Sequence, residues 1–167
     1  MDPRQAGDTI TALVLEQIFE TPYIVGPTGT IEPWLFAEKL RQDRAGDQPV
    51  YSAAVRQGIV FSDGTPLTAE LAAASLARTK ALFGRAKVAA ANERVVFTMS
   101  GPSPRFEMVL TQWNTAIVLE RPASLATRFV GTGPYILAPE TTLQSIKQSG
   151  VTRLERNARY WSKAYID

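Results

Sequence analysis

The chain has 167 residues, of which 45% are hydrophobic and 20% are charged, a balance typical of one globular domain with a substantial core. It contains no cysteine and no histidine, which excludes disulfide bonds, a thiolate nucleophile, a Ser-His-Asp triad and the commonest zinc ligands. The formal charge is only +2, and the basic residues are spread along the chain, which argues against a nucleic-acid-binding surface.

The first predicted element is an amphipathic helix over residues 9–19. Asp8 or Thr9 can cap its start with a side-chain oxygen, and Pro22 ends it because the residue before a proline avoids the α region. The predicted buried stripe follows the i, i+3, i+4, i+7, i+8 spacing and consists of Ile10, Leu13, Val14, Gln17 and Ile18.

Residues 23–63 are expected to form strands and turns. They predict, in order, a short strand with a Gly/Pro turn and an extended exit (23–33), a helical turn (34–40), a polar loop (41–49) and two strands (50–56 and 59–63). Gly58 is expected to join the last two strands, because glycine adopts a positive φ without steric cost.

A second helix is predicted over residues 68–83, with Thr68 as its N-terminal cap and Gly84 as its stop. The residues expected on its buried face are Ala72, Leu76, Thr79 and Phe83. The remaining predicted elements are a strand (94–100), a short helix (105–112), a buried strand (115–120), a helical turn (124–129), a strand after a glycine-rich turn (130–137) and a strand leading into an aromatic loop (151–161). This irregular interleaving predicts a mixed α/β layer fold.

The polar stretch "FSDGTPLTAE" (61–70) resembles an active-site loop at first sight. Its residues also suit a scaffold role: Asp63-Gly64 makes a turn, Thr68 caps the next helix, and Glu70 lies in the first turn, where the helix dipole favours an acid. The scaffold interpretation is the one we adopt.

The glycine-rich stretch "GTGPY" (131–135) is interpreted as a tight turn. A P-loop requires a lysine after its second conserved glycine, and a dinucleotide fingerprint requires a third glycine between a strand and a helix. Pro134 and Tyr135 follow the second glycine here, so the sequence does not predict nucleotide binding.

Glu16 and Glu20 lie four residues apart and admit three interpretations. They can be a pair for acid/base catalysis, two solvated acids, or one carboxylate at a cleft edge that meets a cationic ligand group. The sequence leaves the three open. The large aromatic residues are expected to pack in the core or at its rim rather than to form ligand platforms, and they are Trp34, Trp113, Tyr135, Tyr160 and Trp161.

Several segments recur in an order that resembles a known family. They are "QIFETP" (17–22), "IEPWLFAEKL" (31–40), "AAVRQGIVFSDGTPLTAE" (53–70), "VVFTMSGPSPRF" (95–106), "VGTGPYIL" (130–137) and "RLERNARYW" (153–161). Together they resemble the family 5 extracellular solute-binding proteins, the oligopeptide, dipeptide and nickel receptors of ABC importers. The chain departs from the family pattern at Leu71, where the family has Asp, and in "EKL", where it has "ESW".

The resemblance implies a periplasmic-binding-protein-like type II fold, in which a ligand is enclosed between two lobes. We expect this chain to be a partial lobe I, with an inserted subdomain over about 36–129 and with 1–35 and 130–167 contributing to the lobe I sheet. The second lobe is expected to be absent. No signal peptide and no apolar run of membrane-spanning length is found in the sequence.

The resemblance also implies a set of site residues. Glu20 matches an acid that faces the amino end of a bound peptide, and the other candidate ligand-binding residues are Thr21, Tyr23, Trp113 and Asn114. The residues expected to form a structural turn are Gly131, Thr132 and Gly133.

The expected function is that of the substrate-binding component of an ABC transporter for peptides or similar small solutes. The expected partners are the solute and the transporter permease, without nucleic acid, cofactor, metal or enzymatic activity. The expected location is periplasmic or extracellular, with a membrane anchor in Gram-positive-type cells. The alternative is a stand-alone lobe that acts as a protein-interaction or dimerisation module through an exposed sheet edge.

Overall fold

The computed structural model describes residues 9–119, 129–141 and 151–162. Its elements are α1 (Thr9–Glu16), β1 (Tyr23–Val25), β2 (Ile31–Pro33), β3 (Arg41–Arg44), β4 (Val50–Ala54), α2 (Ala69–Ala77), β5 (Ala86–Ala91), β6 (Arg94–Met99), α3 (Phe106–Val109), the 3-10 helix η2 (Trp113–Thr115), β7 (Tyr135–Leu137) and β8 (Leu154–Arg156). Among these described elements, no helix is long and apolar enough to cross a membrane.

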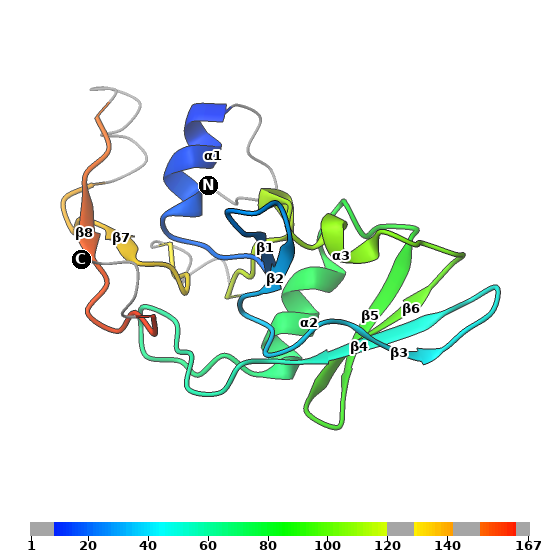
Figure 1. The fold of residues 1–167 in the computed structure, drawn as a ribbon. Coiled ribbons are helices and arrows are strands. Elements are labelled where there is room, and N and C mark those ends of the chain that lie inside the picture. Colours follow the sequence, from blue (N-terminus) through cyan, green and yellow to red (C-terminus); the bar gives the residue numbers. More distant parts are fainter. Residues whose placement is uncertain (1–8, 120–128, 142–150, 163–167) are drawn as a thin grey trace.

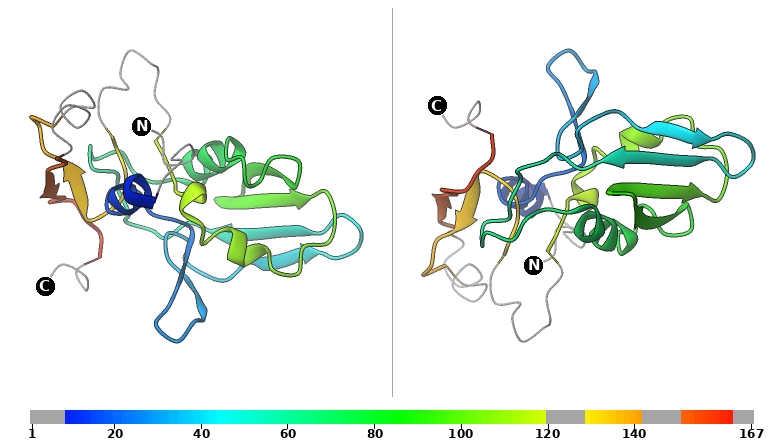
Figure 2. Two further views of the ribbon diagram at one scale, coloured as in Figure 1. Left: turned by 90° about the horizontal axis from the view of Figure 1, so that it is seen from above. Right: turned by 90° about the horizontal axis from the view of Figure 1, so that it is seen from below.

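The largest sheet has the strand order β3-β4-β6-β5, and its neighbouring strands are all antiparallel. α2 packs against β5 and β6. β1 and β2 form a separate hairpin that projects from the rest of the molecule (Figure 2). β7 pairs with β8 at the end away from the large sheet, and α1 lies between these two ends (Figure 1). The predicted mixed α/β fold is therefore confirmed.

Phe97 on β6 lies at the centre of the main hydrophobic core and is fully buried. Its ring centroid lies 5.1 Å from that of Phe106 and 6.4 Å from that of Phe36. The predicted alternation along this strand is confirmed, because Val95 and Met99 are buried on the same face as Phe97. Each large apolar side chain buried in this way contributes roughly 1.5–3 kcal/mol to stability.

α2 begins at its predicted cap but ends earlier than predicted. The Thr68 hydroxyl accepts a hydrogen bond from the backbone N–H of Leu71 at 3.3 Å. After Ala77 the chain continues through turns that bury Leu82, so the helical spacing no longer applies and Phe83 is 86% exposed. The predicted burial of Phe83 is wrong, whereas the rest of the predicted face is buried at Ala72, Leu76 and Thr79.

The first helix is also shorter than predicted, and its buried positions differ from the predicted stripe. It ends at Glu16, and Leu13 is 57% exposed. Beyond Glu16 the chain is no longer helical, so the predicted stripe is wrong at Leu13 and Gln17, which are exposed, and is confirmed at Ile18, which is buried. The buried residues of this region are Ala12, Leu15, Ile18 and Phe19. The alternative cap Asp8 lies outside the described residues.

Two short predicted elements, the helical turn at 34–40 and the strand at 59–63, are wrong. Residues 34–40 follow an irregular path because their N–H groups find distant partners: the N–H groups of Trp34 and Phe36 both donate to the Pro22 carbonyl. Residues 59–63 form a single β-bridge, Val60 with Pro66, because the Asp63-Gly64 turn folds the chain back at once.

Other differences follow from strand partners that the sequence does not reveal. Residues 115–119 form no strand, although the Ile117 N–H donates to the Glu20 carbonyl at 2.9 Å. β3 lies in the predicted polar loop and is exposed throughout, which suits a sheet edge protected by charged side chains. β5 was not predicted, and α3, β7 and β8 are shorter than expected. The predicted turn at 124–129 lies almost entirely outside the described residues.

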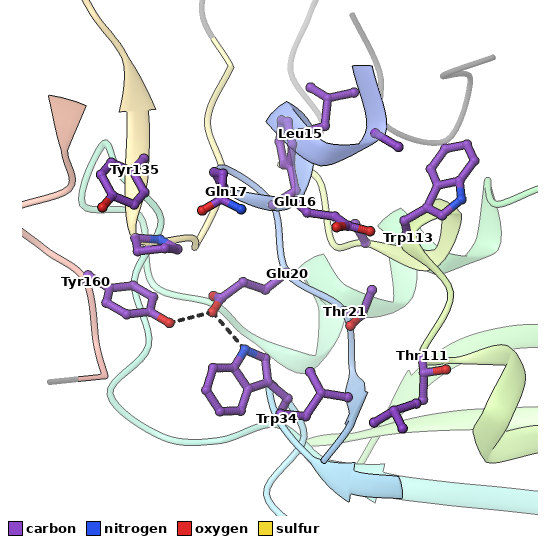
Figure 3. Close-up of a pocket in the computed structure, with 16 residues that line it drawn as sticks. Leu15, Glu16, Gln17, Glu20, Thr21, Trp34, Thr111, Trp113, Tyr135 and Tyr160 are labelled. Carbon is purple, nitrogen blue, oxygen red and sulfur yellow. Dashed lines mark hydrogen bonds between the residues drawn. The ribbon is translucent and has the colours of Figure 1, made fainter. Parts of the chain in front are cut away.

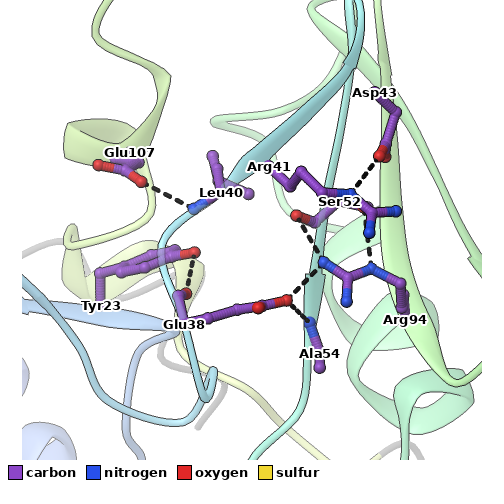
Figure 4. A network of polar contacts seen from close by, with 9 residues as sticks. All are labelled: Tyr23, Glu38, Leu40, Arg41, Asp43, Ser52, Ala54, Arg94 and Glu107. Atoms are coloured by element: carbon purple, nitrogen blue, oxygen red, sulfur yellow. Dashed lines mark hydrogen bonds and ion pairs between the residues drawn. The ribbon is translucent and has the colours of Figure 1, made fainter.

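A polar network joins the segment before β3 to the large sheet (Figure 4). The Glu38 carboxylate accepts hydrogen bonds from the Arg94 guanidinium and from the Ala54 N–H. The Tyr23 hydroxyl donates to the Glu38 carbonyl at 2.9 Å, and the Leu40 N–H donates to the Glu107 carboxylate at 2.8 Å. The bond from Arg94 holds the pKa of Glu38 below its ordinary value. The network therefore fixes residues 37–40 without regular secondary structure.

Candidate ligand-binding site

Glu20 lies in the irregular segment that follows α1, and it is only 7% exposed. Its Oε1 accepts hydrogen bonds from Trp34 Nε1 at 2.8 Å and from the Tyr160 hydroxyl at 3.0 Å (Figure 3). Its Oε2 accepts a third bond from Trp161 Nε1 at 3.0 Å. Aromatic donors from two distant parts of the sequence therefore converge on one carboxyl group.

The protonation of Glu20 is governed mainly by its burial. Removing the carboxylate from water raises the pKa of Glu20, and the hydrogen bonds from Trp161, Trp34 and Tyr160 oppose this rise because they favour the charged form. Within the described residues, no lysine or arginine forms an ion pair with it. Glu20 is thus a buried acid held by neutral donors.

The glycine-rich turn at 131–133 packs directly beneath this segment. The Gly133 N–H donates to the Ile18 carbonyl at 2.9 Å, and the Tyr135 N–H donates to the Gln17 carbonyl at 3.0 Å. A Cβ atom at Gly131 or Gly133 would overlap these backbone carbonyl groups. Glycine is therefore required at both positions so that the two backbones can approach each other.

Residues 157–161 complete the junction around Glu20. The Asn157 side-chain amide donates to the Gly133 carbonyl at 2.8 Å, and the Asn157 N–H donates to the Pro134 carbonyl at 2.8 Å. A turn from Asn157 to Tyr160 follows and presents Tyr160 and Trp161 to the carboxyl group. The "GTGPY" and "RLERNARYW" segments thus act together to position the donors of Glu20.

A cavity of about 670 Å³ lies beside this junction (Figure 3). Its size is within the range of small-molecule sites in proteins. The lining residues come from α1, the segment after it, β1, the residue that follows β2, the region of η2, and the β7 and β8 regions. They are Ala12, Leu15, Glu16, Gln17, Phe19, Glu20, Thr21, Ile24, Val25, Trp34, Thr111, Trp113, Ala116, Pro134, Tyr135 and Tyr160. Carboxylates and aromatic rings are the prominent functional groups of this wall.

The structure brings some of the candidate ligand-binding residues together and separates others. Glu20, Thr21 and Trp113 line the cavity. Tyr23 does not line it, because its side chain is fully buried and its hydroxyl is bonded to the Glu38 carbonyl. Asn114 is also absent from the lining, and its Oδ1 is buried without a hydrogen-bond partner among the described residues.

The predicted turn residues Gly131, Thr132 and Gly133 are all buried. Sequence reasoning missed the aromatic lining of the cavity, because Trp34, Tyr135 and Tyr160 were expected only to pack. The signal that could have found them is that each of these aromatic residues belongs to a recognisable motif, "IEPW", "GTGPY" or "ARYW".

The residues that the structure describes around the cavity do not include the ligand set of a metal site. Within the part of the chain that the structure describes, no group of three or more carboxylate, histidine or cysteine side chains is placed to hold an ion. Glu20 is instead committed to neutral N–H and O–H donors. The arrangement is suited to non-covalent binding in an aromatic cavity with acidic groups.

Solved structures show the same fold over nearly the whole chain. The pheromone receptor PrgZ, whose structure describes its mode of peptide binding, has a TM-score of 0.79 and 19% identity over 96% of this chain and 37% of its own. A nickel ABC transporter protein from Bacillus halodurans has a TM-score of 0.76 and 25% identity over 96% of this chain and 33% of its own. The binding protein AgaA from A. tumefaciens R10, in complex with agropinic acid, has a TM-score of 0.76 and 24% identity over 97% of this chain and 34% of its own.

This chain therefore has the fold of a periplasmic binding protein type II lobe and spans about a third of the length of these structures. No curated protein sequence matches the chain. The family model of the bacterial extracellular solute-binding proteins, family 5 Middle, matches residues 30–167. Because the match covers most of the chain and agrees with the fold, the chain belongs to the bacterial extracellular solute-binding proteins of family 5.

Proposed function

We propose that this chain forms part of the solute-capturing component of an ABC importer and that the cavity beside Glu20 is its share of the ligand site. The observation that carries the proposal is the convergence of aromatic donors from two family segments on one carboxyl group at the wall of an aromatic cavity of ligand size. Family membership supports the class of function.

The proposed solute is a peptide or another small molecule of similar size. The relatives differ in this respect, since one structure describes peptide binding, another belongs to nickel transport and a third holds agropinic acid. In the proposal, residues 36–129 form a subdomain inserted into lobe I, and a second lobe closes over the ligand. Such closure buries the ligand and accounts for affinity that one wall alone does not supply.

Within the cavity, we assign ligand contact to Thr21 and Trp113, with Glu20 at the cleft wall. Tyr23 and Asn114 act indirectly, because neither lines the cavity. The proposed protein is a non-catalytic receptor that works outside the cytoplasmic membrane and delivers its solute to a permease. The family description as extracellular solute-binding proteins supports this location.

Calorimetric titration with a mixed pool of short peptides tests this function. We expect the Trp113→Ala variant to bind the pool more weakly than the wild-type chain, by about tenfold, because an aromatic side chain at a ligand wall typically contributes 1 kcal/mol or more. The matched control is Phe83→Ala, which removes an aromatic side chain that is 86% exposed and lies outside the cavity.

Thermal melts of both variants separate loss of binding from loss of folding. Equal affinity of the wild-type chain and the Trp113→Ala variant for the peptides would show that Trp113 does not contact the ligand. If neither the wild-type chain nor a longer protein containing it bound any peptide or small solute, the receptor assignment itself would be wrong.

A further inference from the structure

The charged residues that line the described part of the cavity are of one sign. Two carboxylates, Glu16 and Glu20, belong to its lining, whereas none of the described lining residues is a lysine or an arginine. The guanidinium of Arg56 lies 5.3 Å from the Trp161 ring centroid and donates to the Trp34 carbonyl, and Arg56 is not part of the lining. The described wall therefore produces a negative potential in the cavity.

The position of Glu16 in α1 increases this potential. Glu16 is the last residue of the helix, where the helix dipole carries its partial negative charge, and no basic residue lies in the last turn. An acid at this end is electrostatically unfavourable unless a cation comes close to it. Among the described residues, the negative charge of Glu16 at the cavity wall is thus not compensated by a basic residue of its own helix turn or by an ion pair.

The two carboxylates differ in their availability to a ligand. Glu20 is buried and accepts three hydrogen bonds from ring donors. Glu16 is exposed, and within the described residues no group forms a hydrogen bond or an ion pair with its carboxylate. In Figure 3 the Glu16 side chain extends toward Trp113, whereas the Glu20 carboxyl group turns to Tyr160 and Trp34.

We infer that this cavity selects positively charged solutes, and that Glu16 is the residue that sets the preference. A ligand ammonium or guanidinium group would pair with the Glu16 carboxylate and lie against the Trp113 ring, whose face attracts cations. Glu20 acts as a positioning residue that holds the aromatic wall. The inference rests on the proposed function and narrows it to a charge class of solute.

The fold alone does not impose this preference. A structure of the same fold holds agropinic acid, so the lobe can serve a ligand that carries a carboxylic acid. The preference inferred here comes from particular side chains of this chain. The competing interpretation is that Glu16 is a solvated acid with no part in binding, and the experiment below decides between the two.

The test uses three tripeptides of equal length, Lys-Phe-Lys, Ala-Phe-Ala and Glu-Phe-Glu, titrated calorimetrically into the protein at low salt. We expect affinity to fall in that order. In Glu16→Gln, the ratio of the lysine-peptide affinity to the glutamate-peptide affinity should shrink by about two- to fivefold, the value of one partly exposed charge pair. Asp47→Asn is the matched control, because it removes one negative charge in the loop between β3 and β4, outside the cavity lining.

The Asp47→Asn variant should retain the wild-type ratio. A wild-type chain that binds all three peptides equally, or that prefers the glutamate peptide, overturns the inference and leaves the proposed function standing. An unchanged ratio in Glu16→Gln, or an equal loss in Asp47→Asn, also overturns it. If none of the peptides binds, peptide binding and the charge preference fall together.

A second measurement needs no variant. The affinity of the wild-type chain for the lysine peptide should fall as salt is raised to about 0.3 M, because counter-ions screen exposed charges at this ionic strength. The affinity for the alanine peptide should change much less. Equal salt sensitivity of the two peptides would contradict a charge-selective cavity.

Discussion

The large sheet and the junction around Glu20 are stabilised in different ways. The sheet is built on an apolar core, in which buried side chains such as Phe97 and Leu76 pack from β6 and α2. The junction is built on backbone carbonyls, two glycines and one buried acid with ring donors. The difference shows that one molecule can combine a core that depends on volume with a site that depends on donor and acceptor geometry.

Truncation of the central core residue should produce the largest effect. Phe97→Ala is expected to destabilise the protein by about 4 kcal/mol, because the change removes buried apolar surface and leaves a cavity. Urea unfolding gives the free energy of unfolding. Phe83→Ala, at an exposed ring, should change it by less than about 0.5 kcal/mol. A similar loss in the free energy of unfolding for the two variants would contradict the position of Phe97 in the core.

Addition of one methyl group should be nearly as damaging at the junction. Gly133→Ala is expected to cost about 3 kcal/mol or more, because the new Cβ overlaps the Gln17 and Ile18 backbones. Gly101→Ala is the control, since a Cβ at that position meets no atom within 4 Å. If thermal melts showed equal stability for the two variants, the close approach of the two backbones would be absent in solution.

The stability contributions of Glu20 at the junction and of Glu38 beside the large sheet should depend on pH in opposite directions. At Glu20, burial raises the pKa above 4.5, so the folded protein binds a proton more tightly than the unfolded chain does. The resulting stability is fully present below pH 4.5 and is lost as pH rises through the folded-state pKa. Glu20→Gln should therefore be most destabilising, relative to the wild-type chain, at acid pH, and the gap should narrow as pH rises.

At Glu38 the sign is reversed, because the Arg94 bond lowers the pKa below 4.5. Its contribution is present above pH 4.5 and is lost as pH falls through the lowered pKa, so the penalty of Glu38→Gln should grow with pH. Denaturant unfolding of both variants across about pH 3.5–6.5 tests this, a range that extends about one pH unit below and two units above the ordinary carboxyl pKa. If the destabilisation caused by Glu20→Gln and that caused by Glu38→Gln changed in the same direction with pH, the environments assigned to the two carboxyl groups would be contradicted.

The smallest effect is expected at the helix cap. Thr68→Ala should cost about 1 kcal/mol, because the Leu71 N–H loses its side-chain acceptor. Ligand binding should be unchanged, since Thr68 does not line the cavity. Peptide titration beside a thermal melt checks both statements, and a loss of binding at unchanged stability would give the "FSDGTPLTAE" stretch a direct part in the site.

Patterns of local origin were the ones that could be predicted. The alternation along β6 and the cap at Thr68 depend on neighbouring residues, and both are confirmed. The strand at 59–63 and the helical turn at 34–40 were wrong because their backbone groups are satisfied by distant segments. The position of the first helix's end was missed for the same reason, since the carbonyls of Gln17 and Ile18 bond with residues 133–135.

For the site, the sequence identified Glu20 as a candidate but left its role open among several interpretations. The structure adds Trp34, Tyr160 and Trp161 as its hydrogen-bond donors, and Tyr160 and Trp161 lie some 140 residues away along the chain. Tyr23 was linked to the cleft by its neighbours in sequence, yet strand β1 turns its ring into the core. Thr21 and Ile24 line the cavity, whereas the Tyr23 side chain between them is buried and bonded to the Glu38 carbonyl, so proximity in sequence does not ensure a shared cavity.

The amino-acid sequence by itself determined the mixed α/β class, the capped helix and the lack of histidine and cysteine chemistry, because these properties depend on composition and short-range periodicity. The family was indicated by the resemblance of several segments, in their order along the chain, to the family's motifs. Only the tertiary structure decided which wall Glu20 faces, why Gly131 and Gly133 must be glycine, and that the Glu20 carboxyl group is held by ring donors while the exposed Glu16 carboxylate has no partner among the described residues. The physical reason is that burial, close backbone approach and hydrogen-bond partners arise between segments far apart in the chain, where no local pattern records them.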